Sequence, residues 1–360
     1  MHNTNKLIPS IKILHVISHL KKGGAERQLS LLLSGSTYNH YVVTLHPNAN
    51  IQSAGIKVIN SLSFREVFRV VSLEIDRQGI DIVQLWLPDR LTIPAMIAAK
   101  FKRKKIISCD RRKPRDYGVF LLLDRIKYIN HAVADIVIAN YPFQSRSISL
   151  KKFLGIPKKS LFIPNGVENE NKEFGLTKKP ECILFVGRLV EQKRVSLLIR
   201  SLPELERVYG VSVLEIVGDG PMKNELISLV TTLNLQGRVI FHGEVTDWQR
   251  KFSKNQYIVM LPSTSEGMSN TLFEAVSSGF YTVSTSSREL EEIQRDWQVK
   301  LPKIHGRGVD GIVDALSDFA EMDLVEISAT TVALGKEVSN YSVPNMVLKY
   351  DESYAQLLAC

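Results

Sequence analysis

The chain has 360 residues, of which 44% are hydrophobic and 23% charged, with a net charge of +9 and three cysteines. These values are typical of a soluble globular protein of two domains, and the few cysteines argue against a disulfide framework. The apolar run from Ile11 to Ile17 is too short for a signal peptide, and no window is long enough to span a membrane. We therefore expect a cytoplasmic protein.

The elements predicted along the chain alternate between strand-like and helix-like windows. In the first half, the strand-like windows are 11–18, 40–46, 56–60, 80–87, 104–110, 135–140 and 161–167. A polar segment that ends in proline follows, and the alternation then restarts at 181–188, 211–221, 238–245, 256–263 and 280–286. This order predicts an α/β fold with two Rossmann-like, doubly wound domains that face each other across a cleft. Ligands of such domains bind at the carboxyl ends of the strands.

The two halves differ in charge. Residues 1–180 carry 29 Lys and Arg against 13 Asp and Glu, whereas residues 181–360 carry 17 against 24. Nine of the basic residues lie between Lys100 and Arg115. Any single one of them is most simply a solvated side chain, but a half at +16 predicts an acidic partner, such as anionic lipid headgroups or a lipid-linked diphosphate. With the amphipathic segment 119–129, this predicts peripheral attachment to the inner face of the cytoplasmic membrane. Nucleic acid is not expected, because no motif accompanies the charge.

Residues 262–279, PSTSEGMSNTLFEAVSSG, are the most informative stretch. Glu266 lies in a Ser/Thr/Gly-rich loop, and Glu274 lies within the apolar pattern of a helix that begins near Thr271. Backbone N–H groups at a helix N-terminus suit a phosphate. A carboxylate would repel that phosphate, so Glu266 is better placed against hydroxyls or an amine. A ligand with phosphate and hydroxyl groups, such as a nucleotide sugar, suits both the helix N-terminus and Glu266.

Other motifs follow predicted strands. Gly23 and Gly24 come after the first strand and allow close approach of a ligand, but they do not form the dinucleotide fingerprint. Arg188 and Lys193 follow the first strand of the second half, and a planar fork beside a point charge suits a diphosphate. Alone, this pair is more simply two exposed basic residues at a helix start. Gly218 lies within GDGP, a sequence that is typical of a structural turn, and PNGV at 164–167 is also most simply a turn. No Asp-x-Asp occurs, so no metal site is expected.

Together these motifs resemble glycosyltransferase family 4, the retaining nucleotide-sugar enzymes of the GT-B fold. The matching pieces are GGAER near residue 23, PNGV at 164–167, VGRLVEQK at 186–193, GDGP at 218–221 and EGMSNTLFEAVSSG at 266–279. The resemblance implies an acceptor-binding domain at 1–168, a linker at 169–180 and a nucleotide-sugar-binding domain at 181–342. It also implies that a C-terminal helix, 343–360, crosses back to the first domain.

The resemblance further implies residue roles. Arg188 and Lys193 would neutralise the donor diphosphate, Glu266 would contact the donor sugar, and Glu274 would bind the nucleotide ribose. The remaining donor-binding residues would be Gly23, Gly24, Gly187, Gly218, Gly267, Met268, Ser269, Asn270, Thr271 and Leu272. No metal or other cofactor would be needed, because electrostatic stabilisation of the leaving diphosphate would supply most of the catalysis.

The chain departs from the family pattern at three places. In the loop after 280–286, SRELEE replaces the glycines that usually precede a Glu, so this loop does not indicate the donor sugar. Asp110, Arg111 and Arg112 stand where many members carry a histidine near the donor sugar, and we assign them to the acceptor side. Arg194 replaces the glycine that usually follows Lys193.

The predicted function is a hexosyltransferase-type enzyme that moves a sugar from a nucleoside-diphosphate sugar to a glycan or polyprenyl-diphosphate-linked acceptor, in the synthesis of a cell-surface polysaccharide such as an O-antigen or capsule. The alternative is a catalytically inactive scaffold of the same fold that docks to membranes or assembly partners.

Overall fold

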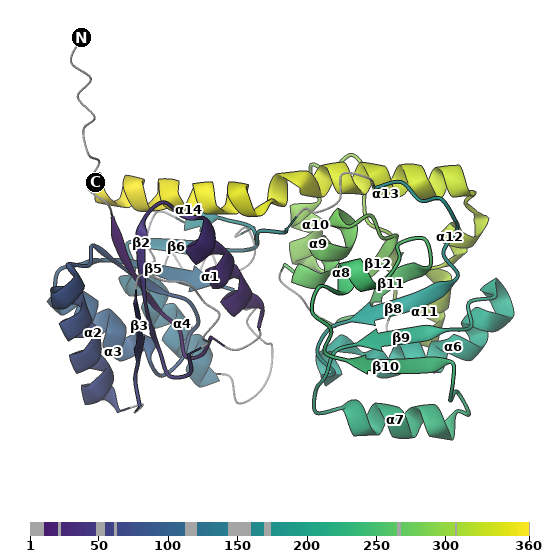
Figure 1. The fold of residues 1–360 in the computed structure, drawn as a ribbon, viewed down its shortest axis with the longest axis horizontal. Helices are drawn as coiled ribbons and strands as arrows, with labels where there is room; N and C mark the ends of the chain where they lie inside the picture. Colours follow the sequence, from purple (N-terminus) through teal and green to yellow (C-terminus); the bar gives the residue numbers. More distant parts are fainter. Residues whose placement is uncertain are drawn as a thin grey trace, which may run out of the picture. The chain divides into compact units, whose positions relative to one another are not determined.

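The computed structural model describes residues 11–20, 23–47, 55–60, 63–111, 121–142, 160–168, 174–264, 268–306 and 308–359 (Figure 1). The chain divides into two compact units. Unit 1 comprises Met1–Gly166 with Val343–Cys360, and unit 2 comprises Val167–Ser342. Each unit is a parallel sheet with helices packed on it, so the predicted α/β fold with two doubly wound sheets is confirmed. Of the predicted linker, residues 169–173 lie outside the described part of the chain.

Unit 1 contains a seven-stranded sheet in the order β3-β2-β1-β4-β5-β6-β7, in which every pairing is parallel. The strands are β1 (Lys12–Val16), β2 (Asn39–Thr44), β3 (Gly55–Val58), β4 (Ile82–Leu85), β5 (Lys105–Asp110), β6 (Ile136–Ala139) and β7 (Ser160–Phe162). The helices are α1 (Gly24–Gly35), α2 (Phe64–Gln78), α3 (Thr92–Phe101), α4 (Leu121–Val133) and α14 (Val343–Leu358). Chain order reverses at β1, which lies between β2 and β4.

Both faces of the first sheet are covered. Ile13 belongs to a buried cluster with α1 and α14, and its neighbour Leu14 belongs to a second cluster with α2 and α3. Successive residues of a strand point to opposite faces, so the continuous apolar runs of these strands fit a sheet buried on both sides. Helix α14 closes the first face by burying Tyr350 and Tyr354 completely.

Unit 2 contains a six-stranded parallel sheet in the order β10-β9-β8-β11-β12-β13. The strands are β8 (Cys182–Val186), β9 (Leu214–Val217), β10 (Val239–Gly243), β11 (Tyr257–Leu261), β12 (Thr282–Thr285) and β13 (Lys303–Ile304). The helices are η1 (Glu191–Lys193), α6 (Val195–Tyr209), α7 (Lys223–Thr232), α8 (Trp248–Lys251), α9 (Asn270–Ser277), α10 (Arg288–Ile293), α11 (Val309–Asp314), α12 (Ser317–Glu321), α13 (Leu324–Val338) and η2 (Ser339–Tyr341). Here the chain order reverses at β8.

None of the helices in the described part of the chain combines the length and the apolar character that crossing a membrane requires.

Candidate functional site

The carboxyl edge of the second sheet gathers most of the predicted donor-site residues. Because β8 lies between β9 and β11, the loops that leave β8 and β11 open a crevice at their carboxyl ends, as in other doubly wound sheets. Arg188 and Lys193 follow β8, Gly218 follows β9, and residues 268–272 follow β11. The topology therefore brings together motifs that lie up to about 80 residues apart in the sequence.

Glycines pack the loops after β8 and β9 directly against each other. A Cβ on Gly218 would lie 1.9 Å from the carbonyl oxygen of Gly187, and one on Gly220 would lie 2.4 Å from that of Leu189. Gly187 and Gly218 also have positive φ angles, 156° and 135°, which disfavour side chains. These glycines have a packing role, which fixes where Arg188 and Lys193 leave the strand.

Lys193 stands at the end of the short helix η1, and hydrogen bonds tie this turn to the loop after β11. The carbonyl of Gln192 accepts the backbone N–H of Thr264 at 2.9 Å. Lys193 is half-buried and Arg188 is exposed. A half-buried ammonium beside an exposed guanidinium gives this crevice a positive charge that favours an anionic ligand.

Arg194, which replaces the family's glycine, makes contacts in the structure that the sequence did not indicate. Its backbone is left-handed (φ 49°, ψ 39°). Glycine adopts this conformation without strain, whereas the side chain of an arginine makes it less favourable. Its guanidinium donates to the carbonyl of Pro262 at 2.5 Å and to the hydroxyl of Thr285 at 3.2 Å. The side chain thus joins the end of η1 to the ends of β11 and β12. Its non-glycine identity was the only signal in the sequence.

A small cavity rich in hydroxyl groups lies where α9 and α10 begin. Its lining includes Ser263, Ser269, Ser284 and Ser287. Ser269 precedes α9 but does not cap it with its side chain. The positive end of a helix beside several hydroxyl groups suits a ligand that carries both negative charge and sugar-like oxygens.

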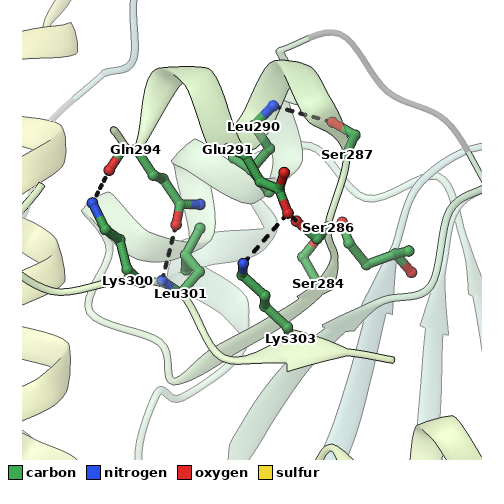
Figure 2. A network of polar contacts seen from close by, with 10 residues as sticks. Ser284, Ser286, Ser287, Leu290, Glu291, Gln294, Lys300, Leu301 and Lys303 are labelled. Atoms are coloured by element: carbon green, nitrogen blue, oxygen red, sulfur yellow. Dashed lines mark hydrogen bonds and ion pairs between the residues drawn. The ribbon is translucent and has the colours of Figure 1, made fainter. Parts of the chain in front are cut away.

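Figure 2 shows the polar network that holds the loop after β12 next to this cavity. Ser286 donates to Glu291 at 2.8 Å, and Lys303 Nζ lies 3.5 Å from the same carboxylate. The hydrogen bond from Ser286 lowers the pKa of Glu291, and Lys303 contributes to the same shift. Ser287 caps α10 by accepting the N–H of Leu290 at 3.1 Å. Glu291 is thus held both by the loop after β12 and by β13.

Glu274, the predicted ribose ligand, lies on α9 and is 6% exposed. The indole Nε1 of Trp248, on α8, donates to its Oε2 at 3.4 Å. Met268 and Leu272 are buried, whereas Ser269, Asn270 and Thr271 are half-buried. Glu266 and Gly267 lie outside the described residues, as does Arg112.

Unit 1 holds the other predicted residues, Gly23, Gly24, Asp110 and Arg111. Asp110 is buried and lies 2.6 Å from Nζ of the equally buried Lys127 on α4. Lys127 belongs to the amphipathic segment expected at the membrane, and its burial removes that cation from the surface.

Arg111 holds the closing helix of unit 1. It donates to the hydroxyl of Tyr350 at 2.6 Å and to Asn165 Oδ1 at 2.9 Å. Its guanidinium also lies 4.4 Å above the ring of Trp86. Asn165 belongs to the PNGV motif, and the next residue, Gly166, donates its N–H to Gln28 at 2.7 Å. These contacts give Arg111 and PNGV a part in attaching α14, alongside the predicted acceptor-side role of Arg111.

Residues 166–323 match the family described as glycosyl transferases group 1. This match covers 158 of the 360 residues, so unit 2 is similar to the group 1 glycosyl transferases. Two relatives are each similar to less than half of this chain. One is an uncharacterized glycosyltransferase of Methanocaldococcus jannaschii, 32% identical over 43% of this chain and 40% of its own length. The other is a Campylobacter jejuni N-acetylgalactosamine-N,N'-diacetylbacillosaminyl-diphospho-undecaprenol 4-alpha-N-acetylgalactosaminyltransferase, 29% identical over 43% of this chain and 42% of its own length. The chain thus spans less than half the length of these two relatives.

Among solved structures, HepE of Anabaena in complex with UDP and glucose superposes with a TM-score of 0.78 at 17% identity, over 96% of this chain and all of that one. At this identity the likeness shows the fold alone. The GT-B fold predicted from the motifs is thereby confirmed.

Within the described part of the chain, no three His, Cys, Asp or Glu residues lie close enough together to hold a metal ion.

Proposed function

We propose that the chain is a retaining hexosyltransferase of glycosyltransferase family 4 that transfers a sugar from a nucleoside-diphosphate sugar to a glycan or polyprenyl-diphosphate-linked acceptor. The observation that carries this proposal is the crevice of unit 2. There, Arg188 and the half-buried Lys193 follow β8, and the start of α9 borders a small cavity lined by serine hydroxyls. Cations and a helix start suit the diphosphate, and hydroxyl groups suit the sugar.

In this mechanism, the chain lowers the barrier by stabilising the leaving group. As the bond between the sugar and the diphosphate breaks, negative charge grows on the phosphate oxygen, and Arg188 and Lys193 bind that charge more strongly than they bind the ground state. The packed glycines 187 and 218 and the bond from Thr264 to Gln192 hold these cations in place before the donor binds. Glu266 contacts the sugar and Glu274 binds the ribose. We also propose that transfer needs no metal, so EDTA should leave its rate unchanged.

The relatives support the choice of substrates. The Campylobacter relative is named for transfer to a diphospho-undecaprenol-linked glycan, and HepE was solved with UDP and glucose. A capsular polysaccharide biosynthesis glycosyltransferase, CapH of Staphylococcus aureus, aligns over 79% of this chain at 22% identity. These names favour a cell-surface polysaccharide pathway.

The test compares Arg188→Ala and Lys193→Ala with Arg200→Ala, which removes an exposed cation from α6. Transfer from a panel of UDP-sugars should fall about 100- to 1,000-fold in the first two variants, because each loses a stabilising contact with the leaving diphosphate. Arg200→Ala should keep the wild-type rate, and all three should unfold at the same temperature. Full transfer by Arg188→Ala and Lys193→Ala would reject the assignment. A wild type that binds UDP-sugars without turnover would favour the inactive scaffold.

We further propose that unit 1 meets an anionic membrane surface through the basic segment 100–105. Phe101, within this segment, is 72% exposed at the end of α3. An exposed aromatic ring among lysines and arginines suits the headgroup region of an anionic bilayer. Phe101→Ser should reduce sedimentation with phosphatidylserine vesicles. Equal sedimentation of the wild type with phosphatidylserine and with phosphatidylcholine vesicles would contradict the proposal.

A further inference from the structure

The crevice of the first sheet carries a group of ionisable side chains that the donor site does not use. In unit 1 the chain order reverses at β1, so the crevice opens between the carboxyl ends of β1 and β4. His19 lies just after β1, and Asp89 lies just after β4. Glu26, from the first turn of α1, joins them. The position that binds ligands in doubly wound domains is therefore occupied in unit 1 by an imidazole and two carboxylates.

Glu26 and His19 form a close pair with unequal exposure. Nδ1 of His19 lies 2.9 Å from Oε1 of Glu26, and the side chains are 45% and 7% exposed, respectively. Backbone contacts fix the histidine, because His19 bridges to His46 and the N–H of Leu20 donates to the His46 carbonyl at 2.8 Å. A held imidazole with a buried carboxylate behind it is the arrangement that orients a histidine in many binding and catalytic sites.

Gly23 makes room for this carboxylate. A Cβ on Gly23 would lie 2.2 Å from Oε2 of Glu26. The backbone of Gly23 is extended (φ −166°, ψ 167°), a conformation that any residue adopts, so its glycine identity follows from the space that Glu26 takes. The glycine turn after β1 therefore accommodates the chain's own carboxylate, which would repel a donor phosphate there.

The pairing decides which ring nitrogen is available. When the ring is neutral, a carboxylate 2.9 Å from Nδ1 favours the tautomer that carries its proton on Nδ1. Nε2 is then left with a lone pair that can accept a hydrogen bond, on a ring that is 45% exposed.

Asp89 adds a second carboxylate to the crevice. Its Oδ1 accepts the N–H of Leu91 at 2.8 Å, which fixes its orientation. Burial raises the pKa of Asp89, while the Ser18 side chain, the backbone of Leu91 and Thr92, and nearby His19 lower it. The carboxylates of Glu26 and Asp89 lie near His19 and disfavour an anion in this crevice, whereas an imidazole nitrogen that accepts a hydrogen bond suits a hydroxyl donor.

We propose that His19, held by Glu26, binds a hydroxyl group of the acceptor sugar through Nε2, at a site between the carboxyl ends of β1 and β4. This inference rests on the proposed glycosyl transfer and names the acceptor subsite within it. Glu26 is a positioning residue, because it acts through the histidine.

The first test measures the tautomer in the full chain without any substrate. Histidine labelled with nitrogen-15 gives the protonation of each ring nitrogen by NMR, and His19→Gln assigns the signal. We expect the proton on Nδ1 in the wild type and a loss of that preference in Glu26→Gln. Gly23→Ala should have the same effect as Glu26→Gln, because the new methyl group displaces the carboxylate without removing it. A wild-type His19 with its proton on Nε2 would overturn the proposal.

The second test separates acceptor binding from donor binding. Transfer from UDP-sugars to octyl glycosides of glucose, galactose, N-acetylglucosamine and N-acetylgalactosamine is measured alongside the affinity for UDP. In His19→Ala, kcat/KM for the glycoside should fall at least about tenfold, as expected for a lost hydrogen bond to a charge-supported group, with UDP affinity unchanged. His46→Ala, which changes an exposed histidine on the neighbouring segment, should keep both values.

The outcomes distinguish this inference from the proposed function. A parallel loss of UDP affinity in His19→Ala, or unchanged transfer, would overturn the acceptor subsite and leave the donor site standing. A wild type that neither binds UDP nor transfers sugar would reject the proposed function and, with it, the acceptor role of His19.

Discussion

The crevices of the two units lie at equivalent places in their sheets, but the side chains that line them differ in charge. In unit 2, glycine backbones pack against one another, and the cations Arg188 and Lys193 stand at the surface or half-buried. In unit 1, Asp110 is paired with Lys127, and Glu26 is paired with His19. The same topology thus provides a cationic crevice in one unit and a charge-paired, acceptor-rich crevice in the other. Topology fixes where a ligand binds, and the side chains decide its charge.

The largest expected effect comes from breaking the buried pair of unit 1. Lys127→Met should cost about 3–5 kcal/mol of unfolding free energy, because it leaves the Asp110 carboxylate buried without its cation. The matched control is Lys102→Met, which breaks the more exposed pair with Asp76 and should cost less than about 1 kcal/mol. Hydrogen exchange should show the loss in the strands of unit 1 and not in those of unit 2. The double variant Asp110→Asn/Lys127→Met should recover part of it, and equal effects of the two lysine variants would contradict this account.

A smaller effect is expected from closing the contact between the two loops of unit 2. Gly218→Ala should cost roughly 2–4 kcal/mol, because its Cβ would meet a backbone oxygen and its φ is positive. Gly237→Ala is the control, since Gly237 also has a positive φ of 81° but no atom within 4 Å of the added Cβ. Denaturant unfolding followed by hydrogen exchange in unit 2 measures both. Similar costs for the two variants would show that backbone conformation, not loop contact, sets the requirement for glycine.

The smallest of these effects is a pH dependence confined to unit 1. His15 and His40 are buried beneath α14. The indole of Trp86 donates to His15 Nδ1 at 2.9 Å, and His15 Nε2 lies 2.7 Å from His40 Nδ1. Burial lowers the pKa of His40 to about 4, and burial followed by His40 lowers that of His15. The unfolded chain binds protons near pH 6.5, so the stability of unit 1 is fully present above that value and falls as the pH drops toward 4.

At pH 5, His40 alone should account for a loss of roughly 2 kcal/mol relative to pH 7.5. Hydrogen exchange at the two pH values, on the wild type and on His40→Asn, measures it. We expect β1 and β2 to lose protection in the wild type and to lose less in the variant. A loss of the same size in the strands of unit 2 would contradict the assignment to buried histidines.

Much of the fold follows from local sequence. The strands were predictable because both sheets are buried on two faces, which gives continuous apolar runs such as those of β6 and β11. The position of the donor crevice followed from the loops that come after these strands. The packing role of Gly218 was not predictable, because it depends on the approach of a loop about 30 residues away in the sequence.

The first crevice was harder to predict, because its contacts join distant segments. Arg111 meets Tyr350, 239 residues later in the chain, and no local pattern marks that pair. Glu26 was visible within GGAER, but its fold back over Gly23 depends on the entry geometry of α1. Trp248, which contacts Glu274, lies in a segment without a recognised motif. Local patterns predict elements and loops, whereas the partner of a polar side chain is decided by tertiary packing.

The crevice of unit 2 should bind the diphosphate of a nucleotide through Arg188 and Lys193. Titration calorimetry with UDP on the wild type, Arg188→Ala and Arg200→Ala tests it most directly. We expect the wild type and Arg200→Ala to bind UDP equally and Arg188→Ala to bind at least about tenfold more weakly, because a charge-assisted hydrogen bond is lost. Equal affinity of all three proteins for UDP would contradict it.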